Sequence, residues 1–392
     1  MAAAAHASRR SGRFLLDALA TASRSAIGTR RFGARAGVDR VALGAIAGAR
    51  GVSSSAPSQR AAKDKAAELA MIKDLREKTG APLMDVKKAL SAASFDLEAA
   101  YAELRTRGLA AASKKAGRLA AEGLVGVSVS TCGQRAAIVE VNAETDFVSR
   151  NEQFLRLVAD VSNAAVAATG AADADGYVDA GALENLAMPD GAFSPGATVA
   201  EAAAATAASV RENIKVRRAY VMTASGAGEV LGHYVHGAVA GAASAGRQAG
   251  LVRVSSRDGG DVDPEKARAV ANKVAMHAVA VAPRFLDPES IPESVVSGEM
   301  AILRAQIEGS GKPASVAEKI VSGKMRKFHE ETCLTKQKFV MDDAKTVETF
   351  VDGESNGLVV SRFARLKVGE GIEVQTKDFA AEVAATVADT AA

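Results

Sequence analysis

The architecture of this chain follows from one stretch of sequence, Ala136-Ala137-Ile138-Val139-Glu140-Val141-Asn142-Ala143-Glu144-Thr145-Asp146-Phe147-Val148. Its first half is an apolar, largely β-branched run, which predicts a buried strand. The run ends in a polar turn that carries Phe147. Beyond the turn, Ser149 and Glu152 have the spacing of a capping box, which predicts a helix with Ser149 as its N-cap. Phe147 thus lies between a strand and a helix, where its ring either folds into the core or stays exposed as a contact residue.

Two similar blocks, each made of two strands and a helix, are predicted around and after this stretch. Apolar spacing places the first block at 124–130, 136–141 and 152–168, and the second at 230–236, 251–255 and 264–280. We therefore expect an α+β fold with a duplicated core, in which helices cover one face of an antiparallel sheet. The core subdomains are expected at 123–225 and 226–290, with an additional helix at 199–209 in the Ala/Gly/Asp-rich stretch 170–208.

A small helical domain is expected before the core, at residues 63–109. Apolar residues recur at helical spacing in three segments, at 66–78, from Pro82 to Leu90, and from Phe95 to a stop at Gly108. Three helices in about 45 residues have little core and are marginal alone. Residues 110–122 are rich in Ala, Lys and Arg without an apolar stripe, which predicts a solvated linker.

The last part of the chain is predicted to contain a helical hairpin. Two helical segments, 295–308 and 315–330, are punctuated by prolines and joined by a Gly/Ser-rich turn, which places an antiparallel hairpin within residues 291–340. Residues 341–392 form the expected C-terminal module. Strand-like segments at 339–341 and 358–363 return the chain to the core, and a final amphipathic helix is expected at 377–388.

The charge of the chain is unevenly distributed. Residues 1–52 contain nine arginines, two aspartates and no lysine or glutamate, a composition typical of an organellar transit peptide. This segment carries a formal charge of +7, so the remainder of a chain with net charge +3 carries −4. A mildly acidic remainder disfavours general nucleic-acid binding and favours a protein partner. We expect delivery to the mitochondrial matrix, with a plastid as the alternative.

Two motifs are more specific than these patterns. One is Asn142-Ala143-Glu144-Thr145-Asp146-Phe147-Val148, and the other combines Ile72-Lys73-Asp74-Leu75-Arg76-Glu77-Lys78-Thr79-Gly80-Ala81-Pro82 with Met84-Asp85-Val86-Lys87-Lys88-Ala89-Leu90. Together they resemble the elongation factor Ts family, and the resemblance extends from about residue 68 to residue 388. It implies a nucleotide-exchange factor of the translational GTPase EF-Tu whose N-terminal domain has a ubiquitin-associated-like fold.

The resemblance also implies which residues bind EF-Tu. The loop that releases the nucleotide near the partner's Mg²⁺ site would be formed by Thr145, Asp146, Phe147 and Val148. Further contacts would come from the N-terminal domain, through Met84, Asp85, Lys87 and Lys88. The core would contribute His236 and Gly237, although a structural role for this histidine, in the core or in a loop, fits the sequence nearly as well. Family members often have cysteine where this chain has Val86 and Ala143, so neither thiol is required here.

Signatures of catalytic chemistry do not occur in the sequence. Neither Gly311-Lys312 nor Gly323-Lys324 has the surrounding residues of a P-loop, so direct nucleotide binding is not expected. His233 and His236 lie three apart on a predicted strand and would face opposite sides, which disfavours a metal site. No apolar run reaches the roughly 20 residues of a membrane span. We expect no cofactor, no metal, no membrane or specific nucleic-acid partner, and no catalytic centre.

The sequence leaves two functions open. The first is nucleotide exchange on mitochondrial EF-Tu during organellar translation. The alternative is a ubiquitin-associated-like scaffold that binds proteins without exchange activity, which would need only the small helical domain.

Overall fold

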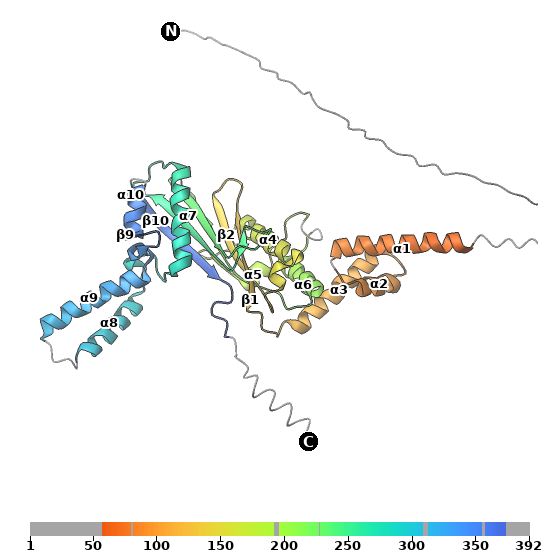
Figure 1. Cartoon of the computed structure of the whole chain (residues 1–392), viewed down its shortest axis with the longest axis horizontal. Coiled ribbons are helices and arrows are strands. Elements are labelled where there is room, and N and C mark those ends of the chain that lie inside the picture. The colour runs from red at the N-terminus through yellow and green to blue at the C-terminus, as the bar shows by residue number, and fades with distance from the viewer. Residues whose placement is uncertain are drawn as a thin grey trace, which may run out of the picture. The chain divides into compact units, whose positions relative to one another are not determined.

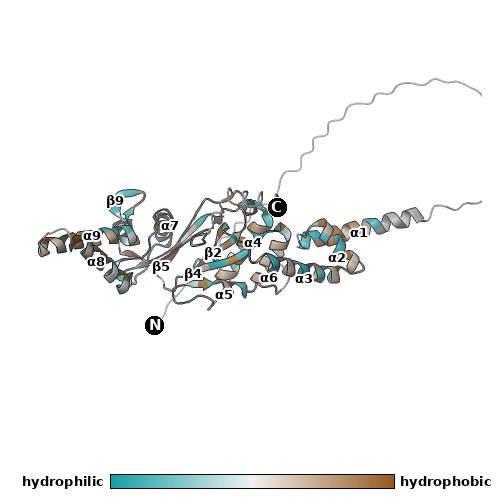
Figure 2. Cartoon of the chain, turned by 90° about the horizontal axis from the view of Figure 1, so that it is seen from below, coloured by the Kyte–Doolittle hydropathy of each residue, from teal (hydrophilic) through white to brown (hydrophobic). Residues whose placement is uncertain are grey.

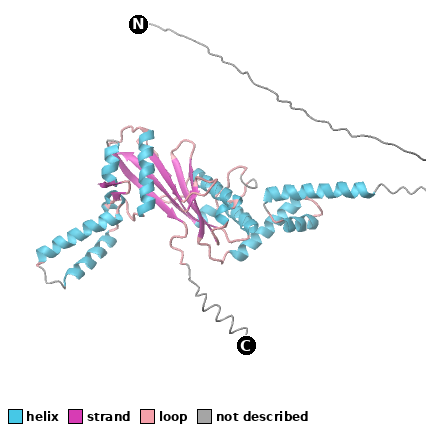
Figure 3. Ribbon diagram, viewed as in Figure 1, coloured by secondary structure: helices cyan, strands magenta, loops and turns pink. Residues whose placement is uncertain are grey.

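The computed structural model describes residues 57–79, 81–191, 196–226, 228–308, 313–354 and 357–373. The predicted transit peptide at 1–52 and the predicted helix at 377–388 lie outside these ranges. The described chain combines helices with antiparallel sheets, so the expected α+β class is confirmed (Figure 1; Figure 3). Among the described helices, none has the length and apolar character needed to cross a membrane.

Three helices form the N-terminal part: α1 (Pro57–Thr79), α2 (Leu83–Ala92) and α3 (Leu97–Lys115). Asp96 is the N-cap of α3, and its side chain accepts a hydrogen bond from the Ala99 amide at 3.0 Å. The helices share a small apolar core, and each carries both hydrophobic and hydrophilic residues along its length (Figure 2). That core contains Ile72, Leu75, Val86, Ala89, Leu90, Ala100 and Leu104.

The expected helix end at Gly108 is wrong, because α3 continues to Lys115. Gly108 lies against α6 (Val199–Val210), where a Cβ atom on it would come within 3.4 Å of the Ala208 Cβ. The glycine therefore permits close helix packing instead of ending the helix. As a result the first residues of the predicted linker are helical.

A five-stranded sheet forms the first half of the core. Its order is β3-β4-β2-β1-β6, and all neighbouring strands are antiparallel. The helices α4 (Glu152–Ala167) and α6 contribute to the apolar cluster on one face. The strands are β1 (Glu122–Val129), β2 (Arg135–Ala143), β3 (Tyr177–Asp179), β4 (Lys215–Thr223) and β6 (Ala245–Gly246).

A three-stranded sheet, ordered β10-β7-β5, forms the second half. It consists of β5 (Glu229–His236), β7 (Gln248–Ser256) and β10 (Leu358–Lys367), and helix α7 (Pro264–Val281) packs on it. Both predicted blocks of two strands and a helix are present. The strand β10 joins the second block from about a hundred residues downstream.

The two sheets share an apolar cluster, so the core has the layer order helix, sheet, sheet, helix (Figure 1). Strand β2 is inside these layers: Val139 and Val141 face the helices, whereas Ile138 faces the second sheet. This is why β2 is buried on both faces and lacks the polar alternation of a half-exposed strand.

The predicted helical hairpin is present as α8 (Glu293–Glu308) and α9 (Ala314–Thr332). Its helices pack through Leu303, Ile307, Val321 and Met325. The short strands β8 (Lys338–Phe339) and β9 (Asp342–Thr346) and helix α10 (Val347–Glu354) then lead to β10. The low-complexity stretch before α6 contains β3 and the short helix α5 (Ala180–Glu184).

The buried side chain of His277 attaches the segment after the hairpin to α7. Its imidazole pairs with the Gln337 side-chain oxygen at 3.0 Å, and its Nδ1 accepts a hydrogen bond from the Val340 amide at 3.2 Å. Since Nδ1 is an acceptor, Nε2 carries the proton and the ring is neutral. Burial lowers the pKa of His277 below its ordinary value of 6.5.

This histidine predicts a loss of stability in acid. The unfolded chain takes up a proton below about pH 6.5 while the folded chain resists it, so the stabilisation is complete above that pH and is lost as the pH falls. We expect the free energy of unfolding to fall by about 1 kcal/mol more in wild type than in His277→Gln between pH 7.5 and 5.5. Urea unfolding at both pH values measures it, with His236→Gln as the control. Equal pH dependence in wild type and His277→Gln would contradict the assignment.

Candidate functional site

The polar turn between β2 and α4 presents an exposed aromatic ring. The Phe147 side chain is 80% exposed, and Asp146 beside it is also exposed. The flanking residues Ala143 and Val148 are buried, with Val148 in the apolar cluster under α4. Of the two alternatives that the sequence left for Phe147, the structure therefore shows the exposed one. The ring extends outward from a turn whose two ends are anchored.

The turn is closed by a short 3₁₀ helix, Val148–Arg150, before α4 begins. Asn151 is the N-cap of α4, and its side chain accepts hydrogen bonds from the Gln153 and Phe154 amides at 2.9 and 3.3 Å. The predicted N-cap at Ser149 is wrong. Ser149 is buried and its hydroxyl donates to the Gly123 carbonyl in β1 at 3.3 Å, which ties the turn to the sheet.

Residues just before β4 hold the other side of the turn. The Thr145 amide and hydroxyl both donate to the Glu212 carboxylate, at 2.9 and 2.6 Å. In the opposite direction, the Asn213 amide donates to the Glu144 carboxylate at 2.6 Å. Arg118 also forms an ion pair with Glu144, at 3.5 Å. The two segments therefore hold each other through three hydrogen bonds, and Arg118 adds an ion pair from outside both.

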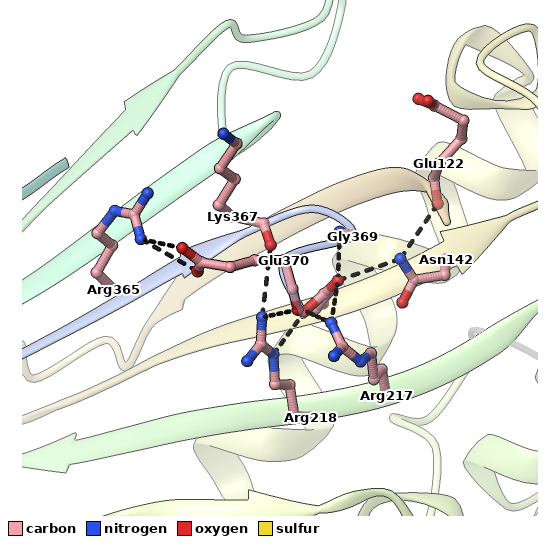
Figure 4. Close-up of polar contacts among 9 residues, drawn as sticks. Glu122, Asn142, Arg217, Arg218, Arg365, Lys367, Gly369 and Glu370 are labelled. Atoms are coloured by element: carbon pink, nitrogen blue, oxygen red, sulfur yellow. Dashed lines mark hydrogen bonds and ion pairs between the residues drawn. The ribbon is translucent and has the colours of Figure 1, made fainter. Parts of the chain in front are cut away.

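The carboxylate of Glu140, two residues before Asn142 on β2, is fully buried. Its partners Asn142, Arg217, Arg218 and Gly369 are labelled in Figure 4. The carboxylate accepts hydrogen bonds from Arg217 at 3.1 and 3.2 Å, from the Arg218 Nε at 2.6 Å, and from the Asn142 side chain at 3.1 Å. The Gly369 amide, after β10, completes the set at 2.8 Å. These donors offset the cost of burying the charge.

A β-bulge explains how two consecutive arginines reach one carboxylate. Residues next to each other on a regular strand point to opposite faces. The register between β2 and β4 shifts here, from Glu140 opposite Arg218 to Val141 opposite Val216. The inserted residue, Arg217, therefore shares a face with Arg218. Arg217 and Arg218 together neutralise Glu140.

The structure brings two of the predicted contact segments to one groove. Asp146 and Arg150 line it from the turn, and Gly237 lines it from the loop after β5. Gly237 has φ +65°, a conformation that favours glycine, and lies against Arg247. Arg247 lines the same groove and forms an ion pair with Glu122. His236 is exposed at the end of β5 beside this groove.

The remaining predicted contact residues lie on α2, in the N-terminal helices. Met84, Lys87 and Lys88 are exposed there, with Met84 at 60% exposure, whereas Asp85 is half-buried. Val86 between them is buried in the small core. Sequence reasoning missed the residues that restrain the turn and the groove, and only Glu212 had a signal, the charged run before β4. These residues are Glu140, Glu212, Arg247 and Glu122.

The arrangement offers rigid protein contacts. Its exposed groups are an aromatic ring and a neighbouring carboxylate, held on a turn that is fixed by buried residues and by charge-assisted hydrogen bonds. Over the described residues, no three His, Cys, Asp or Glu side chains lie close enough together to hold a metal ion. An exposed aromatic ring and a carboxylate on an anchored turn are typical of a contact surface for another macromolecule.

Comparison with known proteins gives the family. The family model described as Elongation factor TS matches residues 144–370. The mitochondrial elongation factor Ts of Ostreococcus tauri is 45% identical over 343 residues, covering 85% of this chain and 97% of that protein. Elongation factor Ts of Paramagnetospirillum magneticum is 44% identical over 80% of this chain and 95% of that protein, and that of Rhizobium johnstonii 41% over 81% and 97%. The chain belongs to the elongation factor Ts family and is therefore a translation elongation factor.

The buried carboxylate leads to a stability prediction. Glu140→Gln keeps the shape but leaves two guanidinium groups without their counter-charge, so it removes one partner of a buried ionic cluster. Because the arginine side chains are 28% and 21% exposed, water compensates in part, and we expect a loss of about 2–3 kcal/mol. Urea unfolding at pH 7.5 measures it.

The matched control for this change is Asp352→Asn. It breaks an ion pair with Arg257 at 3.4 Å in which both side chains are more than half exposed, so it is expected to change stability by less than about 1 kcal/mol. Similar losses in the two variants would show that the Glu140 cluster contributes no more than a surface pair.

Proposed function

We propose that this protein promotes GDP release from mitochondrial EF-Tu by inserting the turn of Thr145, Asp146, Phe147 and Val148 near the Mg²⁺ and nucleotide site of that GTPase. The observation that carries the proposal is the exposed ring of Phe147 on a turn with buried ends. Single exposed apolar side chains are common on protein surfaces, but among the described residues Phe147 is the most exposed of the large apolar ones, and a partner pocket would bury it. Membership of the elongation factor Ts family supports the identity of the partner.

The energetics of this proposal are those of differential binding. A GTPase holds GDP through phosphate contacts and Mg²⁺, so the factor must bind the nucleotide-free state more tightly than the loaded one. Each tenfold weakening of GDP requires about 1.4 kcal/mol of coupling, and GDP weakens the binding of the factor equally. Burial of Phe147 can supply roughly 1.5–3 kcal/mol, enough for one to two decades. Other contacts must anchor the factor on the partner while the Phe147 ring, here called the wedge, enters its pocket.

The N-terminal helices are proposed as one of these anchors. We infer that α1, α2 and α3 form a ubiquitin-associated-like domain whose α2 face contacts the GTPase. Met84, Lys87 and Lys88 are exposed on that face, which supports a combined apolar and charged contact. The half-buried Asp85 is the fourth residue of the proposed contact.

The groove beside the turn is proposed as a second anchor. Gly237 and Asp146 line it together, so a partner surface that contacts His236 and Gly237 also lies next to the wedge. The turn with Phe147 and the proposed contact surface at His236 and Gly237 then belong to the same rigid part of the protein. A functional site needs this support to hold its geometry. In this proposal only the partner binds the nucleotide, and the factor needs no cofactor, metal, membrane or specific nucleic acid of its own.

Organellar delivery completes the proposal. The arginine-rich segment 1–52 has the composition of a transit peptide, and one relative at 45% identity is named as mitochondrial. We therefore infer that the protein acts in the mitochondrial matrix after removal of that segment.

The wedge is tested by Phe147→Ala. Because the ring is 80% exposed, the variant should keep its free energy of unfolding within about 0.5 kcal/mol. It should accelerate release of a fluorescent GDP analogue from mitochondrial EF-Tu roughly 10- to 100-fold less than the wild type at saturating factor.

The control for this test is Val281→Ala, which truncates another exposed apolar side chain, 43% exposed at the end of α7. It should release GDP like the wild type. Full activity of Phe147→Ala would show that another part of the factor releases GDP. No acceleration by the wild type would refute exchange on this partner.

The N-terminal anchor is tested by the double variant Lys87→Glu with Lys88→Glu. Charge reversal on an anchor weakens association without changing the wedge, so the half-saturating concentration of factor should rise about tenfold while the maximal rate of GDP release stays the same. Lys114→Glu with Lys115→Glu, at the end of α3, makes the same change of charge as a control. A lower maximal rate with an unchanged half-saturating concentration would contradict an anchoring role.

A further inference from the structure

We propose that Glu212 is a positioning residue for the turn: its carboxylate holds Thr145 and thereby sets the direction of the Phe147 ring. Glu212 lies outside the turn, two residues after the end of α6. The proposal rests on the proposed exchange function for its effect on rate, but the geometry of the clamp can be tested without any partner.

The contact between Glu212 and Thr145 restrains both the backbone and the side chain of the turn. One carboxylate oxygen accepts the Thr145 amide at 2.9 Å, and the other accepts its hydroxyl at 2.6 Å. Hydrogen bonds to an ionised carboxylate are stronger than neutral ones, and two parallel bonds also fix orientation. Thr145 is two residues before Phe147, so these bonds restrain the backbone that carries the ring.

Glu212 is itself held in place by its neighbours. Arg211 ends α6 in the left-handed conformation, with φ +63°, which turns the chain sharply before Glu212. Asn213 is 3% exposed, and its side-chain amide donates to the Arg118 carbonyl at 2.7 Å. Its backbone amide donates to Glu144, so the clamp runs in both directions between the two segments.

The bulge in β4 extends this restraint into the core. Arg217 and Arg218 lie five and six residues after Glu212, in β4. Both form ion pairs with the buried Glu140 on β2, the strand that leads into the turn with Phe147. The segment 212–218 therefore contacts the turn at its start and the strand below the turn at its end. A wedge fixed in this way enters the partner without first losing conformational freedom.

Removing the clamp should loosen the ring without unfolding the protein. Glu212→Gln keeps the size of the side chain but removes the charge and can accept through only one oxygen. The turn remains anchored by Ala143 and Val148, which are buried. We expect the maximal rate of GDP release to fall about tenfold, because part of the binding free energy is then used to order the turn.

The test uses the fact that the chain contains no tryptophan. Phe147→Trp places a single fluorescent indole on the turn, and its time-resolved anisotropy reports local motion in the free protein. The comparison is made with and without Glu212→Gln. Thr145→Val, which removes the hydroxyl donor but keeps the amide, provides a second variant should Glu212→Gln unfold.

The matched control is Glu229→Gln. Glu229 also accepts two backbone amides of a loop, from Ser225 at 2.6 Å and from Gly226 at 3.3 Å, but it lies at the start of β5, away from the turn. This variant should leave both the anisotropy of the indole and the rate of GDP release unchanged.

The outcomes separate the alternatives. The proposal is supported by two results together. The indole of Phe147→Trp moves faster locally when Glu212→Gln is added, and Glu212→Gln alone, with Phe147 intact, has a lower maximal rate of GDP release. An unchanged anisotropy, or an unchanged rate despite a freer indole, overturns it. If Phe147→Ala and wild type release GDP equally, the wedge itself fails, and that result is independent of what the anisotropy shows.

Discussion

The buried carboxylate of Glu140 is the interaction on which the rest of the core depends. It lies on the face of β2 that meets the second sheet, where a lone charge would be strongly destabilising. Its neutralisation requires a bulge in β4, so that Arg217 and Arg218 share a face, and it draws the turn after β10 onto the first sheet through Gly369. One ionic cluster thus joins three chain segments that are distant in sequence (Figure 4).

The position of this cluster matters because β2 leads directly into the turn with Phe147. The same segment that supplies the arginines supplies Glu212, so the strand and the turn are held from one side by a single stretch of chain. The groove with Gly237 is adjacent, and its Arg247 carbonyl accepts the Val368 amide at 3.0 Å. The turn with Phe147, the groove and the start of the C-terminal segment are therefore held together by the same contacts. The proposed exchange mechanism requires such a connection between the contact surface and the inserted ring.

Much of this arrangement could be predicted from sequence because the local signals were strong. The β-branched run of β2, the helix α7 and the proline-punctuated hairpin all follow from periodicity and helix-boundary rules. The rest depended on tertiary contacts. A glycine such as Gly108 has the same local signal whether it ends a helix or permits close packing. The N-cap of α4 lies at Asn151 and not at Ser149, because Ser149 is buried and bonded to β1. The β4 bulge and the pairing of β10 with β7 have no local signature at all.

The proposed exchange mechanism is tested by comparing the affinity of this factor for nucleotide-free EF-Tu with its affinity for EF-Tu saturated with GDP, by calorimetry under the same conditions. A factor that releases GDP by differential binding should bind the nucleotide-free form at least about a hundredfold more tightly, because linkage requires the two effects to be equal. Equal affinities would contradict the proposed exchange mechanism, because a factor that binds both forms equally cannot shift the equilibrium between them.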